Sequence, residues 1–169
     1  MAVTIAAPVR PGNVYVPSET FRDYLKSILT HFISFGQKEF ILVMGHGGPD
    51  MKNSVTNACN YLCEKHEVSI AVFHISQILK DLHLVDTSVD RHAGMWETSI
   101  IMAIDDSLIK NLNFYRKCKE PHKYGVVGDP LKASPGQGLK FIKAIIDYVE
   151  NCFKSLTASK CYYNWLKSK

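Results

Sequence analysis

The strongest constraint on the fold is the alternation of helical patterns with short apolar runs in the first half of the chain. Apolar residues between Phe21 and Ile33 recur at helical spacing, and the run EFILVMG at 39–45 follows them. A second helical pattern, begun near Asp50, precedes the run VSIAVFHI at 68–75. Because strands that alternate with helices are joined by crossover connections, the sequence predicts an α/β fold with a mainly parallel sheet.

Element boundaries can be predicted at several points. Ser18 is the expected N-cap of the first helix, Gly36 its expected end, and both apolar runs are expected to be buried strands. The segment 134–137, Ser-Pro-Gly-Gln, predicts a capping box that opens the last helix. The buried stripe of that helix is expected to be Leu139, Ile142, Ile145, Ile146, Val149 and Phe153. The run 94–104 fits a helix and a strand equally well.

Length and charge limit the classes of protein. A chain of 169 residues, 46% of them hydrophobic, predicts one domain over 1–169 with a sizeable core. The formal net charge is +4, and the basic residues are scattered. Basic residues among aromatics at 160–169 could bind nucleic acid, but a C-terminal helix that docks its aromatic side chains is the commoner arrangement. We therefore expect no nucleic-acid partner.

The cysteines and the N-terminus bear on location. The chain has five cysteines, an odd number without the spacing of a disulfide framework, which predicts a reducing, cytoplasmic location. Cys59 and Cys63 lie on the apolar stripe of the second helix, and we interpret them as small core residues rather than half of a metal site. No run predicts a membrane span, and residues 1–17 do not have the pattern of a signal peptide.

The segment Gly45-His46-Gly47-Gly48 is the first candidate site. It follows an expected strand, and ligands of open parallel sheets bind beyond the carboxyl ends of the strands. The glycines would let a metal ion or a substrate approach the backbone closely, with His46 pointing into the crevice. The alternative is a tight strand-to-helix turn in which the histidine is incidental.

Two further clusters carry polar residues that could take part in chemistry. In residues 90–99, DRHAGMWETS, Glu97 would lie in the first turns of a helix and His92 near its N-cap. The alternative is that Glu97 only caps that helix while Asp90 and His92 form a polar turn. In residues 124–138, Asp129 could be catalytic, but an aspartate before proline is usually a turn former, and we favour that structural role.

The three clusters, taken in order, resemble the creatininase (creatinine amidohydrolase) family. Members carry an Asn-Gly-His-Gly-Gly-Asn or Asn-Gly-His-Tyr-Glu-Asn segment, then His-Ala-Gly-x-x-Glu-Thr-Ser, then Gly-Val-x-Gly-Asp-Pro. The corresponding segments here read MGHGGPD, HAGMWETS and GVVGDP. The helix and strand that precede the histidine are also similar, so the resemblance extends over nearly the whole chain.

The resemblance implies a three-layer α/β/α fold and metal-dependent hydrolysis of a small-molecule amide, either non-peptide or cyclic. The metal would be zinc, manganese or iron. By position, His46 matches a metal ligand, Glu97 a residue at the metal with a catalytic role, and His92 a proton shuttle. The residues expected to line the substrate or shape its loops are Gly47, Gly48, Asp50, Trp96 and Asp129.

The chain also departs from the family pattern. Relatives have an earlier segment with Glu-x-His and a later Asp, which supply further metal ligands, and residues 1–17 here contain no Glu, His or Asp. Met44 and Pro49 replace the asparagines, and Gly48 replaces the glutamate of creatininase itself. We therefore expect an incomplete or partner-completed site, an exposed sheet edge and a homo-oligomer. The alternative is a non-catalytic binding or assembly domain that has lost its metal ligands.

Overall fold

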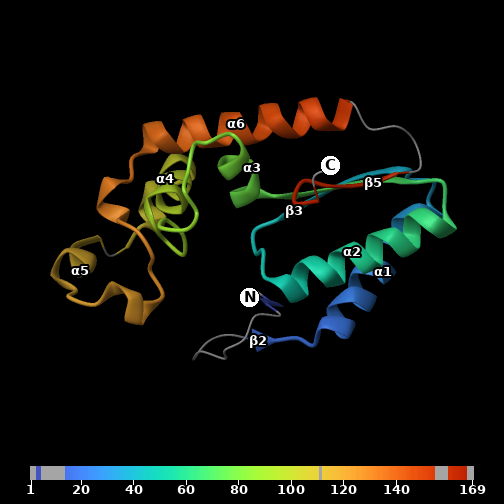
Figure 1. The fold of residues 1–169 in the computed structure, drawn as a ribbon, viewed down its shortest axis with the longest axis horizontal. Coiled ribbons are helices and arrows are strands. Elements are labelled where there is room, and N and C mark those ends of the chain that lie inside the picture. Colours follow the sequence, from blue (N-terminus) through green and yellow to red (C-terminus); the bar gives the residue numbers. More distant parts are fainter. Residues whose placement is uncertain (1–2, 5–13, 111, 155–159, 167–169) are drawn as a thin grey trace. The chain divides into compact units, whose positions relative to one another are not determined.

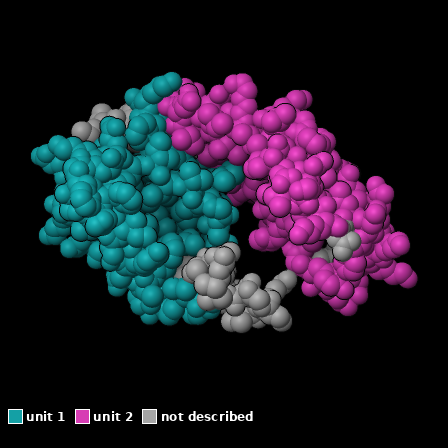
Figure 2. Space-filling model, turned by 180° about the vertical axis from the view of Figure 1, so that it is seen from behind, with its two compact units in different colours: residues 1–75, 152–169 teal, residues 76–151 magenta. Residues whose placement is uncertain are grey.

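The computed structural model describes residues 3–4, 14–110, 112–154 and 160–166. The chain divides into two compact units, coloured separately in Figure 2: unit 1 is residues 1–75 with 152–169, and unit 2 is residues 76–151. The single domain over 1–169 stays a prediction.

Unit 1 is built on a parallel three-stranded sheet in the order β3-β4-β5. The strands are β3 Glu39–Met44, β4 Ser69–His74 and β5 Cys161–Tyr163. The helices α1 Ser18–Ser34 and α2 Pro49–Lys65 lie together beside this sheet (Figure 1). A separate two-residue pair, β1 Val3–Thr4 with β2 Val14–Tyr15, is also parallel. The prediction of an α/β fold with a parallel sheet is confirmed.

The core of unit 1 lies between the sheet and these two helices. β4 is buried along its whole length, as predicted for a central strand. β3 differs from the prediction, because its residues alternate: Phe40 and Leu42 pack against the core, whereas Ile41 and Val43 are exposed, Val43 by 61%. Among the described residues β3 pairs only with β4, so it is an edge strand with one solvated face. The buried core residues are Leu29, Met44, Met51, Val55, Cys59, Leu62, Val68, Ile70, Val72 and Tyr163.

The ends of α1 agree only in part with prediction. The residue in the N-cap position is Pro17, which offers no side-chain cap, so Ser18 is the first helical residue and the predicted cap was wrong. Gly36 ends the helix as expected. It has φ +88°, and its N–H donates to the carbonyl of Ile33 while the N–H of Gln37 donates to Phe32. Glycine adopts this left-handed conformation without steric cost.

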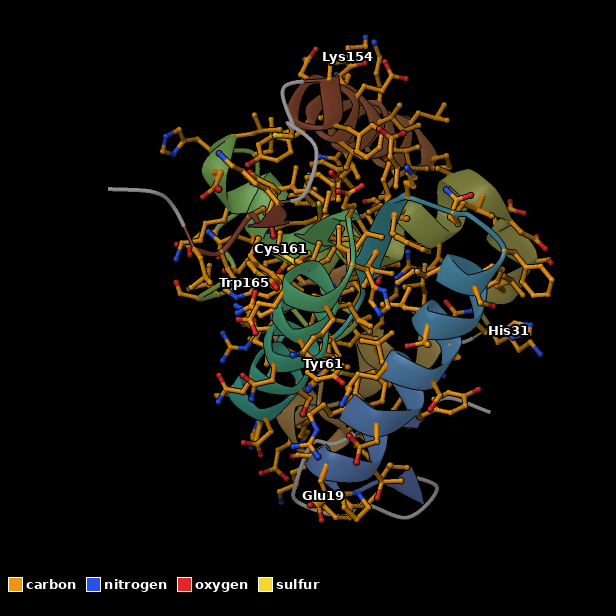
Figure 3. The ribbon with its side chains drawn as sticks, turned by 90° about the vertical axis from the view of Figure 1, so that its right-hand side faces the viewer. Glu19, His31, Tyr61, Lys154, Cys161 and Trp165 are labelled. Carbon is orange, nitrogen blue, oxygen red and sulfur yellow. A yellow bond between two sulfur atoms is a disulfide. The ribbon has the colours of Figure 1, made fainter. Side chains whose placement is uncertain are left out.

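The C-terminal segment forms a strand, so the predicted C-terminal helix was wrong. β5 is fixed to α2 by a disulfide between Cys161 and Cys63, which are 98 residues apart, and Cys161 and Trp165 both lie close to α2 in Figure 3. Cys63 is therefore a cross-link rather than a small core residue, whereas Cys59 is buried as predicted. Since disulfides are typical of oxidising compartments, the cysteines no longer support a cytoplasmic location, which stays a prediction.

Unit 2 is mainly helical. The run 94–104 forms a helix from Met95 onward. The last helix begins with half of the predicted capping box: the N–H of Gln137 donates to Oγ of Ser134 at 3.3 Å, but the N–H of Ser134 donates to Ser99 instead of to Gln137. Its buried stripe was predicted correctly only in part: Leu139 and Ile146 are exposed and Phe141 is buried instead, whereas Ile142, Ile145, Val149 and Phe153 are half-buried. The elements that begin in residues 75–154 are α3 Ile75–Asp81, α4 Met95–Ile104, η1 Asp106–Leu108, α5 Leu112–Lys117, η2 Pro121–Tyr124, η3 Pro130–Lys132 and α6 Pro135–Lys154.

None of the helices in the described ranges combines the length and the apolar character that crossing a membrane requires.

Candidate functional site

The turn after β3, residues 45–48, brings two histidines together at the carboxyl end of the sheet in unit 1. A Cβ atom added to Gly47 would lie 2.3 Å from Cε1 and Nε2 of His74, and one added to Gly48 would lie 2.7 Å from Nε2 of His46. A Cβ on Gly45 would meet nothing within 4 Å. Both imidazoles therefore lie against the backbone of the turn, and a side chain at Gly47 or Gly48 would displace them. We call them the His46–His74 pair.

His74 is the site residue that sequence reasoning missed. In the sequence it is only a histidine at the end of the run 68–75. The pairing of β3 with β4 places it opposite Met44, and Met44 precedes His46 by two residues. Its side chain is nearly enclosed, with 9% of the residue exposed. Burial is the main cause that lowers the pKa of His74 to about 4, and the nearby charges of Lys52 and His46 contribute to the same shift. At neutral pH the ring is therefore the neutral imidazole, the form that binds metals.

In unit 2, Asp90 organises the second cluster. Its Oδ1 accepts from the N–H of Met95 at 2.6 Å and its Oδ2 from the N–H of Trp96 at 3.2 Å, so the carboxylate caps the start of α4. The indole Nε1–H of Trp96 donates to the carbonyl of Asp90 at 3.0 Å, and Trp96 is buried. A Cβ on Gly94 or Gly128 would collide with the Asp90 side chain. Asp90 is thus the residue around which this loop is packed.

Glu97 is bonded to the start of its own helix. Its Oε2 accepts from the N–H of Ala93, which is the capping role that the sequence left as an alternative. Both Ala93 and His92 have positive φ, at 62° and 56°, a conformation that costs about 1–2 kcal/mol for a residue with a Cβ. The paired backbone groups of Arg91 and Val127 help to hold this strained loop. Backbone strain at residues with positive φ is common at functional sites.

The remaining candidates have local roles. Asp129 caps η3, with Oδ1 accepting from the N–H of Leu131 at 3.0 Å, which is the structural role that the sequence favoured. Asp50 lies in the first turn of α2 and is exposed.

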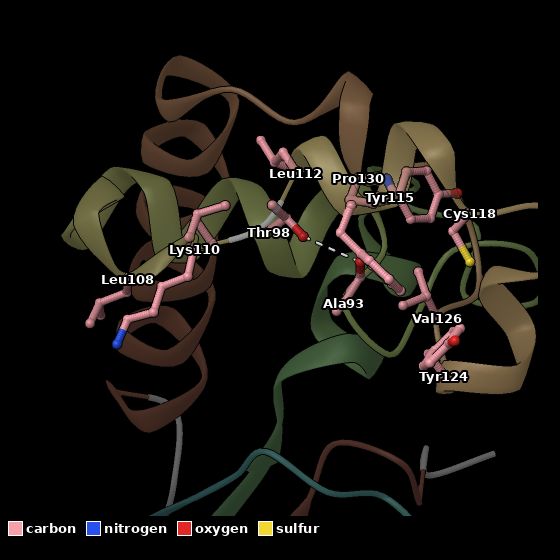
Figure 4. A pocket seen from close by; sticks show the side chains of 12 residues that line it. Ala93, Thr98, Leu108, Lys110, Leu112, Tyr115, Cys118, Tyr124, Val126 and Pro130 are labelled. Carbon is pink, nitrogen blue, oxygen red and sulfur yellow. Dashed lines mark hydrogen bonds between the residues drawn. The ribbon is translucent and has the colours of Figure 1, made fainter.

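Unit 2 also contains a cavity of about 280 Å³ beside the strained loop (Figure 4). Its walls are mostly apolar, and two of its polar groups are already bonded to the protein: Oγ1 of Thr98 to the carbonyl of Ala93 at 3.3 Å, and the hydroxyl of Tyr115 to the carbonyl of Gly128 at 2.8 Å. Such a cavity suits a small apolar group better than a polar one.

A protein-family model covers both segments described above, residues 45–48 and 90–99. The family model described as Creatininase, creatinine amidohydrolase, matches residues 3–153. This chain belongs to the creatininase family. Among curated protein sequences, none matches it significantly.

Creatininase-family enzymes are typically metal-dependent, and the donors described here can be tested against that requirement. A catalytic zinc site has about three protein ligands. In the described ranges, no three His, Cys, Asp or Glu side chains are placed to hold one metal ion. The His46–His74 pair offers two nitrogens within unit 1, and the carboxylate of Glu97, in unit 2, accepts a backbone hydrogen bond. The residues described here therefore do not fit a complete metal centre.

The turn offers a matched pair of variants. We expect Gly47→Ala to destabilise the protein by about 1 kcal/mol and to displace the His74 ring, because the new methyl group would overlap that ring. Gly45→Ala, where the methyl group meets nothing, should leave the ring in place. Urea denaturation and the NMR signals of the His74 ring would measure both effects. An unchanged ring signal in Gly47→Ala would contradict the described geometry.

Proposed function

We propose that this chain is a creatininase-type, metal-dependent hydrolase domain that cleaves a non-peptide or cyclic amide C–N bond, with a metal site completed by another chain. The main support is the glycine-lined His46–His74 pair at the carboxyl end of a parallel sheet, where such folds bind ligands. Membership of the family over residues 3–153 supports the reaction class.

The residue roles in this proposal follow the family resemblance and the local geometry. His46 is a metal ligand and His74 adds a second neutral imidazole beside it. Glu97 is the proposed carboxylate of the site and His92 the proton shuttle. Zinc, manganese or iron is the proposed metal. A second copy of the chain is the proposed source of the remaining ligands, since the edge strand β3 leaves backbone groups available for pairing.

Metal content per chain tests the proposal. Protein purified without chelator would be separated by size and analysed by elemental analysis, beside His46→Ala and Gly45→Ala. We expect near-stoichiometric zinc, manganese or iron in an oligomeric fraction, lost in His46→Ala and kept in Gly45→Ala. The metal-loaded fraction should hydrolyse a cyclic amide. A metal-free wild type at every oligomeric state would contradict the proposal.

The second candidate function is a non-catalytic binding or assembly domain, and one observation favours it. The Glu97 carboxylate already serves as a capping group for α4, which is what a former ligand with only a structural role would do.

Glu97→Gln separates the two candidates. If Glu97 only caps α4, the variant should lose about 1 kcal/mol of stability, because a neutral amide is a weaker acceptor at a helix N-terminus, with no change in metal content. If Glu97 binds the metal, its loss should also lower the metal content several-fold. Glu64→Gln, at an exposed position on α2, is the matched control and should change neither quantity.

A further inference from the structure

On the side of β5, the carboxyl end of β4 is bound by one residue of the C-terminal segment, Asn164, whose N–H also donates to the carbonyl of Val72 at 3.2 Å. The pairing of β4 with β5 ends at Val72 and Tyr163. Beyond it, Oδ1 of Asn164 accepts from the N–H of His74 at 2.9 Å, and Nδ2 of Asn164 donates to the carbonyl of His74 at 3.1 Å. Asn164 is 1% exposed. A single buried amide therefore binds both backbone groups of His74, on the side where the pairing with β5 has ended.

The position of the His74 ring depends on this contact. The ring is enclosed and lies against the backbone of Gly47, so it has little freedom to compensate for a movement of its own backbone. A shift at the end of β4 would therefore move the ring relative to the His46 turn.

Asn164 in turn depends on how β5 is attached. β5 has only three residues, and a strand this short is weakly held by its backbone pairing alone. Two of its side chains attach it to α2: Cys161 by the disulfide with Cys63, and Tyr163, whose hydroxyl donates to Oδ1 of Asn60 at 2.7 Å and lies 3.2 Å from the carbonyl of Thr56. The disulfide is the covalent one, three residues before Asn164.

We propose that Asn164 is a positioning residue that holds His74 against the His46 turn, and that the Cys63–Cys161 disulfide decides whether it does so. The inference rests on the proposed function only in taking the His46–His74 pair as part of the site. A dithiol reductant would attack the disulfide, which gains two electrons and two protons to become two thiols, while the dithiol loses them and closes to a cyclic disulfide. β5 would then keep only its noncovalent contacts.

The first test compares Asn164→Ala with Tyr163→Phe in the isotopically labelled full chain. The readouts are the NMR signals of the His74 ring and the ratio of amide hydrogen exchange at His74 to that at Ser69, whose N–H donates to the carbonyl of Lys38 and so does not depend on β5. We expect Asn164→Ala to raise this ratio at least tenfold and to shift the ring signals. Tyr163→Phe removes a noncovalent contact with α2 but leaves both the disulfide and the Asn164 amide, so the ratio should rise less than threefold and the ring signals should stay in place.

The second test needs no change at Asn164. Dithiothreitol added to the wild type should raise the same exchange ratio at least threefold, and Cys63→Ser with Cys161→Ser should reproduce the result without reductant. Cys118→Ser, a free cysteine in unit 2, is the control and should have no effect.

Each outcome bears on the inference. A folded Asn164→Ala protein with an unchanged ratio and unchanged ring signals overturns the positioning role. An unchanged exchange ratio after complete reduction of the disulfide overturns the role of the disulfide. If Asn164→Ala does not fold, this reduction experiment alone tests the inference, and the same unchanged ratio overturns it. None of these readouts requires bound metal, so a metal-free protein, which would contradict the proposed function, leaves this test intact.

Discussion

Gly138→Ala should destabilise unit 2 by about 3 kcal/mol or more, although alanine is the better helix former. Gly138 lies in α6 directly against α4. A Cβ there would be 1.9 Å from the carbonyl oxygen of Ser99 and 2.7 Å from Cβ of Ala103. A backbone oxygen cannot rotate away as a long side chain can, so the two helices would have to separate.

Separation of the helices would also disturb a buried polar contact. Ser99 is fully buried, its hydroxyl donates to the carbonyl of Met95 at 2.7 Å, and it accepts from the N–H of Ser134 at 3.1 Å. The second of these bonds ties the start of α6 to α4. Because an unsatisfied buried donor costs about 1–3 kcal/mol, a forced shift would add to the steric penalty.

Gly136→Ala is the matched control for this prediction. It lies two residues earlier in the same helix, and its Cβ would meet nothing within 4 Å. We expect it to stabilise the protein by about 0.5 kcal/mol, since alanine reduces the freedom of the unfolded chain. Urea denaturation followed by Trp96 fluorescence in a Trp165→Phe background would measure both variants. Equal stability of the two alanine variants would mean that α4 and α6 do not pack through Gly138.

The sequence predicted those features of the fold that depend on local pattern. The continuous apolar run ending at His74 correctly indicated a fully buried parallel strand, and the glycines around His46 correctly indicated a strand-to-helix turn. The family resemblance was confirmed over residues 3–153. In each case the residues that decide the structure are neighbours in the sequence.

Apart from the N-cap of α1, the errors concern partners that are far apart in the sequence. Cys63 and Cys161 are 98 residues apart, and nothing in their spacing indicates that β5 lies beside α2. Leu139 and Ile146 fit a helical stripe, but whether such a stripe is buried depends on what packs on it. His74 could have been found from the sequence by aligning the ends of the two apolar runs, because parallel strands bring their carboxyl ends to one edge of the sheet.

His74 should also make the protein sensitive to acid. Burial holds the pKa of His74 in the folded state at about 4, below the ordinary value of 6.5. Between pH 6.5 and 4 the unfolded chain therefore binds a proton that the folded protein does not. The contribution of His74 to the free energy of unfolding is fully present above pH 6.5 and is lost as the pH falls toward 4. The expected loss is about 2 kcal/mol, less than the whole shift would give because solvent reaches part of the ring.

Lys52 supplies the variant that tests this cause. Its ammonium group lowers the pKa of His74, so Lys52→Met should raise that pKa and reduce the loss of stability in acid. Urea denaturation at several pH values, beside NMR titration of the His74 ring, would measure both quantities. If His74 titrates near 6.5 in the folded protein, the ring is open to water and the enclosed His46–His74 pair is wrong. If it titrates near 4 and Lys52→Met moves it upward, the neutral imidazole beside His46 is a property of the folded site itself.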